Sequence, residues 1–181
     1  MFIISKKLCL LGEIAVGKTS LVRRYVDRQF SERYLSTIGV KISRQTINLK
    51  KIHHYEQSSL QFVIWDIEGQ IKFNYLTPNY LQGASAAIAV ADITRYSTIE
   101  RLSEYIQLFL SINPQGKIAI ALNKSDLFKQ KEATKIIEEV VIKNHPQIMG
   151  IYPTSAKTGT NVDEMFKKVG EQLINFDNQC Y

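Results

Sequence analysis

The segment 12–19 restricts the possible folds more than any other part of this sequence. It reads Gly-Glu-Ile-Ala-Val-Gly-Lys-Thr and matches the pattern G-x-x-x-x-G-K-[ST], in which backbone N–H groups surround a phosphate. The apolar run 8–11 precedes the segment, and Leu21 and Val22 follow it in a helical pattern. Because a chance match would rarely have both neighbours, we predict a phosphate-binding loop between a buried strand and a helix.

The residues of this loop have separate expected roles. Gly12 and Gly17 permit tight backbone turns, and the N-terminus of the following helix adds a partial positive charge. Lys18 is predicted to contact the β- and γ-phosphates, and the Thr19 hydroxyl to bind Mg²⁺. The candidate phosphate-binding residues are Gly12, Glu13, Ile14, Ala15, Val16, Gly17, Lys18, Thr19 and Ser20.

Strand-like and helix-like patterns alternate along all 181 residues. This alternation predicts an α/β fold with a mostly parallel sheet, formed as a single domain over residues 1–181. Continuous apolar runs, typical of buried parallel strands, occupy 8–11, 86–91 and 118–122. The segments 45–49 and 60–65 are interpreted as two antiparallel strands joined by a polar stretch, 50–59.

Helical periodicity predicts three amphipathic helices after the P-loop helix. Ser97 and Glu100 have the spacing of a capping box, and Asn161 is expected to cap the C-terminal helix. The apolar stripes are interpreted as core and comprise Ile99, Leu102, Ile106, Phe109 and Leu110, then Ala133, Ile136, Ile137, Val140 and Val141, then Val162, Phe166, Val169 and Leu173.

Composition argues against several classes of protein. No apolar run reaches the roughly 18 residues that span a bilayer, and Phe2 stands where N-myristoylation requires Gly. Cys9 and Cys180 are interpreted as unpaired thiols in a reducing cytoplasm.

The net charge of +6 comes from dispersed basic residues, which argues against a nucleic-acid partner. His53 and His54 are interpreted as solvent-facing, because no third metal ligand of their kind lies near them.

Two later segments carry the expected selection of guanine. Residues 123–126 read Asn-Lys-Ser-Asp and follow the apolar run 118–122. The Asp126 carboxylate can accept hydrogen bonds from guanine N1 and its exocyclic amine, a donor pair that adenine lacks. Residues 154–157, Thr-Ser-Ala-Lys, are expected to close over the base. The candidate base-binding residues are Asn123, Lys124, Asp126, Ser155, Ala156 and Lys157.

With these motifs in this order, the chain resembles the Ras-like GTPases, and among them the Rab family. The resemblance covers nearly the whole chain and rests on the P-loop, Thr37, Asp66-x-x-Gly69-Gln70 and the two guanine segments. The segments that most resemble the Rab family are Ser-Thr-Ile-Gly-Val at 36–40, Trp65 before Asp66, Leu-Thr-Pro at 76–78 and Gly-Ala at 83–84. The resemblance implies a six-stranded sheet with five helices. It also implies a monomeric switch that binds GTP or GDP with Mg²⁺, hydrolyses GTP, and acts in signalling or vesicle trafficking.

The resemblance also implies the residues that contact the nucleotide. Phe30 would pack against the guanine edge, and Tyr34 would lie near the γ-phosphate. The Gly69 amide would bond to the γ-phosphate, and Gln70 would orient the attacking water. Gln70 and Lys18 are therefore the catalytic candidates.

The metal candidates implied by the resemblance are Thr19, Thr37 and Asp66. Thr37 would add its hydroxyl to Mg²⁺ and its amide to the γ-phosphate, and Asp66 would hold Mg²⁺ through water. The amides of Thr37 and Gly69 would bond only to a third phosphate, so hydrolysis would release both segments.

Two residues depart from the family pattern within this machinery. Ile14 stands where the family often has Gly and would crowd the space used by Gln70. Glu68 replaces the usual Ala and would bring a carboxylate near the γ-phosphate and Mg²⁺, or turn outward without effect. We therefore predict slow intrinsic hydrolysis and a weak response to activating proteins. The alternatives are that Gln70 still works, or that the chain is a GTP-binding interaction module with little hydrolysis; a P-loop kinase or ATPase conflicts with 123–126.

The expected partners are effectors, an exchange factor and a GTPase-activating protein. Trp65 and Tyr80 match the aromatic trio of the Rab effector face, but Ile42 takes the third place and Lys41 stands where an acidic residue is usual. Cys180 is not at the CaaX position. Either the protein lacks a lipid anchor or the sequence is a trimmed form, so we expect a cytoplasmic protein that is peripheral on membranes in the second case.

Overall fold

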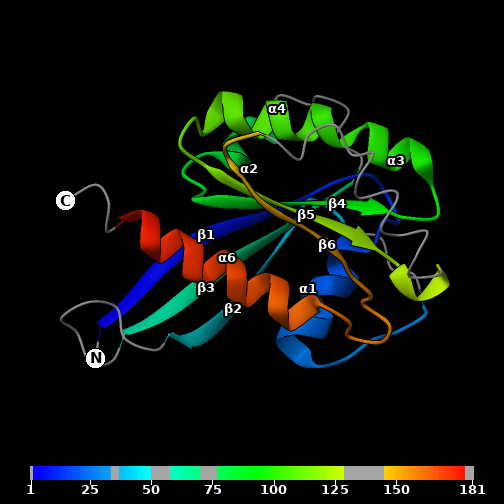
Figure 1. Cartoon of the computed structure of the whole chain (residues 1–181), viewed down its shortest axis with the longest axis horizontal. Coiled ribbons are helices and arrows are strands. Elements are labelled where there is room, and N and C mark those ends of the chain that lie inside the picture. The colour runs from blue at the N-terminus through cyan, green and yellow to red at the C-terminus, as the bar shows by residue number, and fades with distance from the viewer. Residues whose placement is uncertain (1, 34–36, 50–57, 70–76, 129–144, 178–181) are drawn as a thin grey trace.

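The computed structural model describes residues 2–33, 37–49, 58–69, 77–128 and 145–177. Its described strands form one six-stranded sheet in the order β2-β3-β1-β4-β5-β6, with helices on both faces (Figure 1). The strands are β1 (Phe2–Leu11), β2 (Val40–Leu49), β3 (Ser58–Ile67), β4 (Ala86–Asp92), β5 (Lys117–Asn123) and β6 (Ile148–Pro153). The helices are α1 (Lys18–Asp27), α2 (Thr77–Leu81), α3 (Tyr96–Glu100), α4 (Leu102–Ile112), η1 (Ser125–Leu127) and α6 (Val162–Asp177).

The sheet confirms the predicted α/β class and its mostly parallel pairing. β1 pairs in parallel with β3 and β4, and β4, β5 and β6 continue in parallel, while β2 and β3 are antiparallel as predicted. The apolar runs at 86–91 and 118–122 lie in β4 and β5, whose residues are almost all buried because helices cover both faces. β1 begins at Phe2, earlier than the run 8–11, because pairing with β3 extends it through Lys6 and Lys7.

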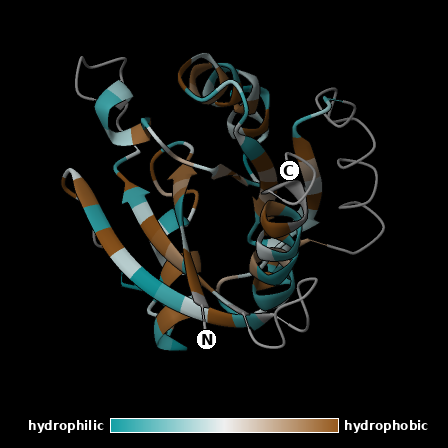
Figure 2. Ribbon diagram, turned by 90° about the vertical axis from the view of Figure 1, so that its left-hand side faces the viewer, coloured by the Kyte–Doolittle hydropathy of each residue, from teal (hydrophilic) through white to brown (hydrophobic). Residues whose placement is uncertain are grey.

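The core lies in two layers on opposite faces of the sheet. Leu8 and Leu10 of β1 face α1 and α6, whereas Cys9 and Leu11 face α3 and α4. Figure 2 shows hydrophobic residues concentrated on the strands and on the helix faces turned toward them. Because the helices cover both faces of the sheet, the loops at the carboxyl ends of the parallel strands are free to form a ligand site. The candidate site lies there.

The predicted capping box at Ser97 and Glu100 is wrong. α3 begins at Tyr96, so Ser97 lies inside the helix, and no side chain caps its N-terminus. The Thr98 hydroxyl instead accepts the Asp92 N–H at 2.9 Å, which links α3 to the end of β4. A short-range spacing could not reveal this contact.

The other helix predictions have mixed outcomes. The Asn161 carbonyl accepts the first bond of α6, from the Met165 N–H, but its side chain donates to the Pro153 carbonyl at 2.8 Å instead of capping the helix. The predicted helix with Ala133 lies outside the described residues, as do His53 and His54. None of the described helices is long and apolar enough to cross a membrane.

Candidate functional site

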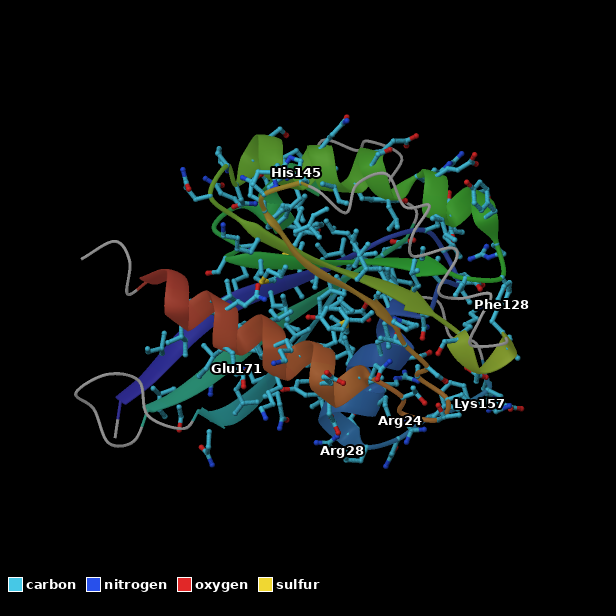
Figure 3. All side chains as sticks on the ribbon, in the orientation of Figure 1. Arg24, Arg28, Phe128, His145, Lys157 and Glu171 are labelled. Carbon is cyan, nitrogen blue, oxygen red and sulfur yellow. The ribbon has the colours of Figure 1, made fainter. Side chains whose placement is uncertain are left out.

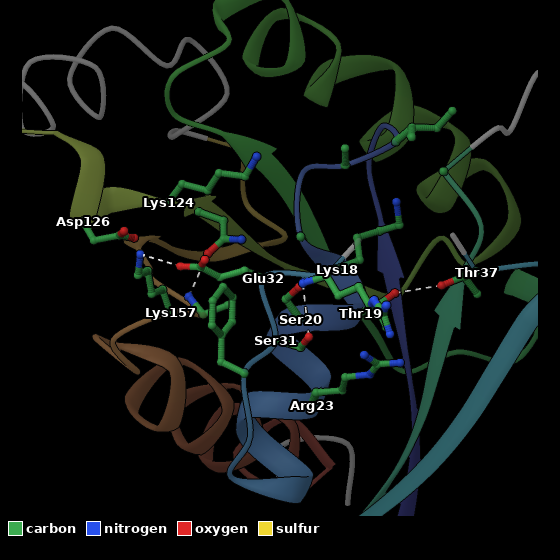
Figure 4. A pocket seen from close by; sticks show the side chains of 18 of the residues that line it. Lys18, Thr19, Ser20, Arg23, Ser31, Glu32, Thr37, Lys124, Asp126 and Lys157 are labelled. Carbon is green, nitrogen blue, oxygen red and sulfur yellow. Dashed lines mark hydrogen bonds and ion pairs between the residues drawn. The ribbon is translucent and has the colours of Figure 1, made fainter. Parts of the chain in front are cut away.

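A cavity of about 760 Å³ opens at the carboxyl ends of the strands, a size that suits a small-molecule ligand (Figure 4). Segments far apart in the sequence form its walls. The lining residues are Ile14, Ala15, Gly17, Lys18, Thr19, Ser20, Arg23, Phe30, Ser31, Glu32, Arg33, Thr37, Ile67, Glu68, Gly69, Asn123, Lys124, Asp126, Leu127, Ala156 and Lys157.

The loop between β1 and α1 has the backbone of an anion-binding site. Gly12, Ala15 and Gly17 have φ angles of +139°, +61° and +99°. Residues with positive φ in a tight loop can gather successive N–H groups into a concavity that suits a phosphate. The motif indicated the two glycines, but it gave no sign of the positive φ at Ala15.

Lys18 lies at the first turn of α1 with its side chain almost completely buried, and only 7% of the residue is exposed. Its Nζ atom donates to the carbonyls of Gly12 and Glu13, both at 2.8 Å. Burial lowers the pKa of Lys18 to about 8, partly offset by the charges of Asp66, Glu13 and Glu68. An ammonium has three N–H donors, so one more is available to a ligand oxygen in the cavity.

The metal candidates meet beside Lys18. The Thr19 hydroxyl donates to Asp66 Oδ2 at 2.6 Å and lies 2.8 Å from the Thr37 hydroxyl. Burial raises the pKa of the Asp66 carboxyl, against the hydrogen bond from Thr19 and the charge of Lys18. Its Oδ1 atom is buried and has no hydrogen-bond partner among the described residues.

These oxygens fit Mg²⁺, which takes hard oxygen ligands at about 2.0–2.1 Å in an octahedron whose neighbouring ligands lie about 2.9 Å apart. The two hydroxyls already have nearly that separation. The described part of the chain contains no group of three or more His, Cys, Asp or Glu residues that could hold a metal. A cation here would therefore depend on Thr19, Thr37 and Asp66 together with ligand oxygens.

The other end of the cavity carries the base-binding candidates. Asn123 is 2% exposed and links two loops: its Nδ2 donates to the Val16 carbonyl at 2.9 Å, and its Oδ1 accepts the Ala156 N–H at 3.1 Å. Asp126 is exposed, and its Oδ1 accepts the Ser155 hydroxyl at 2.6 Å. Asn123 therefore holds the loops together, while the Asp126 carboxylate is presented at the cavity wall.

Several predicted residues do not line the cavity. Among the described residues, Gly12, Glu13, Val16 and Ser155 are not part of its lining, and Val16 and Ser155 are fully buried. They support the lining through the bonds to Lys18, Asn123 and Asp126. Tyr34 and Gln70 lie outside the described residues, so their roles stay predictions.

Arg24 of α1 supports the base end, although the motifs gave no indication of it. Its Nε donates to the Ala156 carbonyl at 2.8 Å, and its Nη2 donates to the Lys157 carbonyl at 2.5 Å. Figure 3 shows Arg24 beside the loop that carries Lys157. The Lys157 ammonium in turn pairs with Glu32 at 2.9 Å, so this loop is joined to the segment that follows Phe30 (Figure 4).

A second unpredicted group surrounds Asp92 at the end of β4. Its carboxylate accepts the Lys124 ammonium at 2.6 Å and the Arg95 Nε at 3.1 Å, and Arg95 also donates to the Ile14 carbonyl at 2.9 Å. Burial alone would raise the pKa of Asp92, but hydrogen bonds from Lys124 and Thr94 outweigh it and lower that pKa. The sequence did contain one indication of this group, because Asp92 is an acidic residue at the end of a buried apolar run.

The two atypical residues both reach the cavity. Ile14 lines it and is 38% exposed. A Cβ at Gly69 would lie 2.6 Å from the Ile14 nitrogen, so the backbone before Gln70 packs directly on the P-loop. Glu68 also lines the cavity, and its Oε2 accepts the Gly39 N–H at 3.1 Å.

The effector-face candidates form one surface on β2, β3 and α2. Ile42 pairs with Trp65 in the sheet register, and the rings of Trp65 and Tyr80 lie 6.5 Å apart. The Lys7 ammonium covers the Trp65 ring at 3.9 Å. Ile42 is 48% exposed, so this surface is accessible at its β2 side.

Comparison with known proteins assigns the family. The model of the Ras family matches residues 7–175. The chain belongs to the Ras family. It is 38% identical to Ras-related protein RABF2a of Arabidopsis thaliana, over 94% of this chain and 82% of the relative. It is 36% identical both to GTP-binding protein ypt5 of Schizosaccharomyces pombe, over 94% of this chain and 78% of the relative, and to Ras-related protein Rab5 of Nicotiana tabacum, over 94% and 82%.

The resemblance read from the motifs is thereby confirmed: the protein is a Rab-like small GTPase, a guanine-nucleotide-binding switch. Its mostly parallel six-stranded sheet agrees with that family. The Ras-family match also explains why the P-loop and the 123–126 motif meet at one cavity in this Rab-like GTPase.

Proposed function

We propose that this Rab-like GTPase binds GTP and GDP with Mg²⁺ in the cavity and acts as a slowly hydrolysing switch in vesicle trafficking. One observation carries the site assignment. The hydroxyls of Thr19 and Thr37 and the Asp66 carboxylate converge within 2.6–2.8 Å at one end of a cavity whose other end presents Asp126. An elongated nucleotide with a metal-bound polyphosphate and a guanine base matches both ends.

In this proposal each side chain acts on a separate part of the ligand. Lys18 places a buried positive charge beside the phosphates, where low dielectric strengthens the attraction. Mg²⁺, when bound, neutralises the charge that develops on the transferred phosphoryl group. The amides of Thr37 and Gly69 bond to a third phosphate, and Gln70 orients the attacking water. Effector proteins contact the surface of Ile42, Trp65 and Tyr80 in the GTP-bound state.

The assignment of the base end is tested with Asp126→Ala. We expect the preference for GDP over xanthosine diphosphate to fall by about 100-fold or more, because the wild-type carboxylate accepts two guanine N–H groups and repels the second xanthine carbonyl. Competition between the two nucleotides for purified protein measures the ratio. Asp163→Ala removes an exposed carboxylate that pairs with Arg28 at 2.5 Å outside the cavity and serves as the control. An unchanged ratio in Asp126→Ala would refute the assignment.

A second candidate function, a GTP-binding interaction module with little hydrolysis, is supported by Ile14. Its side chain lines the cavity against the backbone that leads into Gln70. A branched side chain at this point excludes volume that the glutamine and the attacking water would need.

We expect Ile14→Gly to accelerate single-turnover GTP hydrolysis about tenfold, equivalent to about 1.4 kcal/mol of activation free energy. We expect Ile14→Ala to hydrolyse GTP at a rate between those of the wild type and Ile14→Gly, because it removes only part of the side-chain volume. Phosphate release from preloaded protein is the measurement. If all three proteins hydrolyse GTP at one rate, Ile14 does not limit hydrolysis.

A further inference from the structure

Glu68 extends the pairing of β2 and β3 with its side chain. The Glu68 N–H donates to the Gly39 carbonyl at 2.9 Å, and the Gly39 N–H donates to Glu68 Oε2 at 3.1 Å. The ladder between the two strands ends at Val40 and Ile67, so these bonds form the next rung. In a regular antiparallel rung the Gly39 N–H would bond to the backbone carbonyl of residue 68. Here the carboxylate takes that position.

This rung fixes one end of segment 37–39, which carries the metal candidate Thr37. The other end is held by the 2.8 Å contact between the hydroxyls of Thr37 and Thr19. Between them, Ile38 is 90% exposed. Because apolar burial contributes almost nothing to this segment, its position depends on the polar contacts at residues 37 and 39.

The two contacts differ in how they respond to the nucleotide. A ligand can shift a conformational equilibrium only by its difference in affinity for the two states. The amide of Thr37 would lose its partner when the third phosphate leaves, whereas the Glu68 carboxylate belongs to the chain and persists. A hydrogen bond to a charged acceptor changes such an equilibrium by about tenfold or more.

We propose that Glu68 is a positioning residue that holds segment 37–39 beside the 66–69 segment in the GDP state as well as the GTP state. This role of Glu68 rests on the proposed nucleotide-binding function and adds a regulatory contact to the same site. An uncharged, short residue at position 68 leaves the Gly39 N–H without this acceptor, so closure of the segment then depends more strongly on the third phosphate. Glu68 therefore reduces the difference in segment 37–39 between the two nucleotide states.

The test is hydrogen exchange at the Gly39 amide, measured by NMR on the full chain loaded with GDP or with a non-hydrolysable GTP analogue. In Glu68→Ala we expect this amide to exchange about tenfold faster in the GDP form and to change much less in the analogue form. Glu68→Gln retains a side-chain carbonyl as acceptor and should restore most of the protection. Unchanged exchange in Glu68→Ala, or equal acceleration in both forms, would overturn the proposal.

A control removes a carboxylate outside the cavity. Asp163 pairs with Arg28, so Asp163→Ala should leave exchange at Gly39 within about twofold of wild type, well below the tenfold effect of one charged hydrogen bond. The bound nucleotide of every sample is quantified by chromatography first. Failure of the wild-type chain to retain guanine nucleotide would contradict the proposed function, whereas retention with unaltered exchange at Gly39 in Glu68→Ala would contradict only the role of Glu68.

Discussion

Lys18→Ala should weaken GDP binding by about 150- to 5,000-fold, because removing one partner of a buried charge pair costs about 3–5 kcal/mol. The Lys18 ammonium is held by the Gly12 and Glu13 carbonyls at 2.8 Å and lies on the cavity wall. Burial lowers its pKa to about 8, because the charged form is poorly solvated in the protein. A phosphate anion would add a further negative charge beside this buried ammonium, where the low dielectric strengthens the attraction.

Lys18→Ala should have only a small effect on the stability of the fold. The variant loses two hydrogen bonds but also removes a buried charge, so we expect the free energy of unfolding of nucleotide-free protein to change by less than about 2 kcal/mol. Affinity is measured by fluorescence titration and stability by urea unfolding. Lys167→Ala, on the exposed side of α6, is the control and should alter neither quantity. A loss of affinity below about tenfold would contradict the assigned role of Lys18.

Gly12→Ala is expected to lower the free energy of unfolding by about 3–5 kcal/mol, from backbone strain and overpacking together. A Cβ at this position would lie 2.2 Å from the Val90 carbonyl oxygen and 3.2 Å from its carbon, in the middle of the sheet. The φ angle of +139° is also unfavourable for any residue with a side chain. Since β4 is buried on both faces, neither backbone can move aside easily.

Gly83→Ala separates these two contributions to the loss of stability. Gly83 has a φ of +72°, but no described atom lies within 4 Å of the position where its Cβ would be. This variant should lose only about 1–2 kcal/mol, the cost of a left-handed residue. Thermal unfolding should show a decrease of roughly 10 °C for Gly12→Ala and a few degrees for Gly83→Ala. Equal decreases in the two variants would exclude the contact with Val90 as the cause.

The sequence predicted most of what depends on local pattern. The uninterrupted apolar residues of β4 and β5 indicated buried parallel strands, because only strands covered on both faces lack polar alternation. The P-loop motif indicated its own strand–loop–helix setting, since glycines and a helix N-terminus act over a few residues. The capping box at Ser97 failed because Ser97 lies inside α3, and the polar side chain that binds backbone there is Thr98, which accepts the Asp92 N–H.

Sequence alone therefore determined the α/β class, the family and the motifs that meet at the cavity. Only the tertiary structure decided that Arg24 holds the loop of Ala156, and that Glu68 accepts the Gly39 N–H. Each of these contacts joins residues brought together by the order of the strands. Local hydrophobic period and turn chemistry carry no information about that order, because it is fixed by which faces and edges bury one another across the whole sheet.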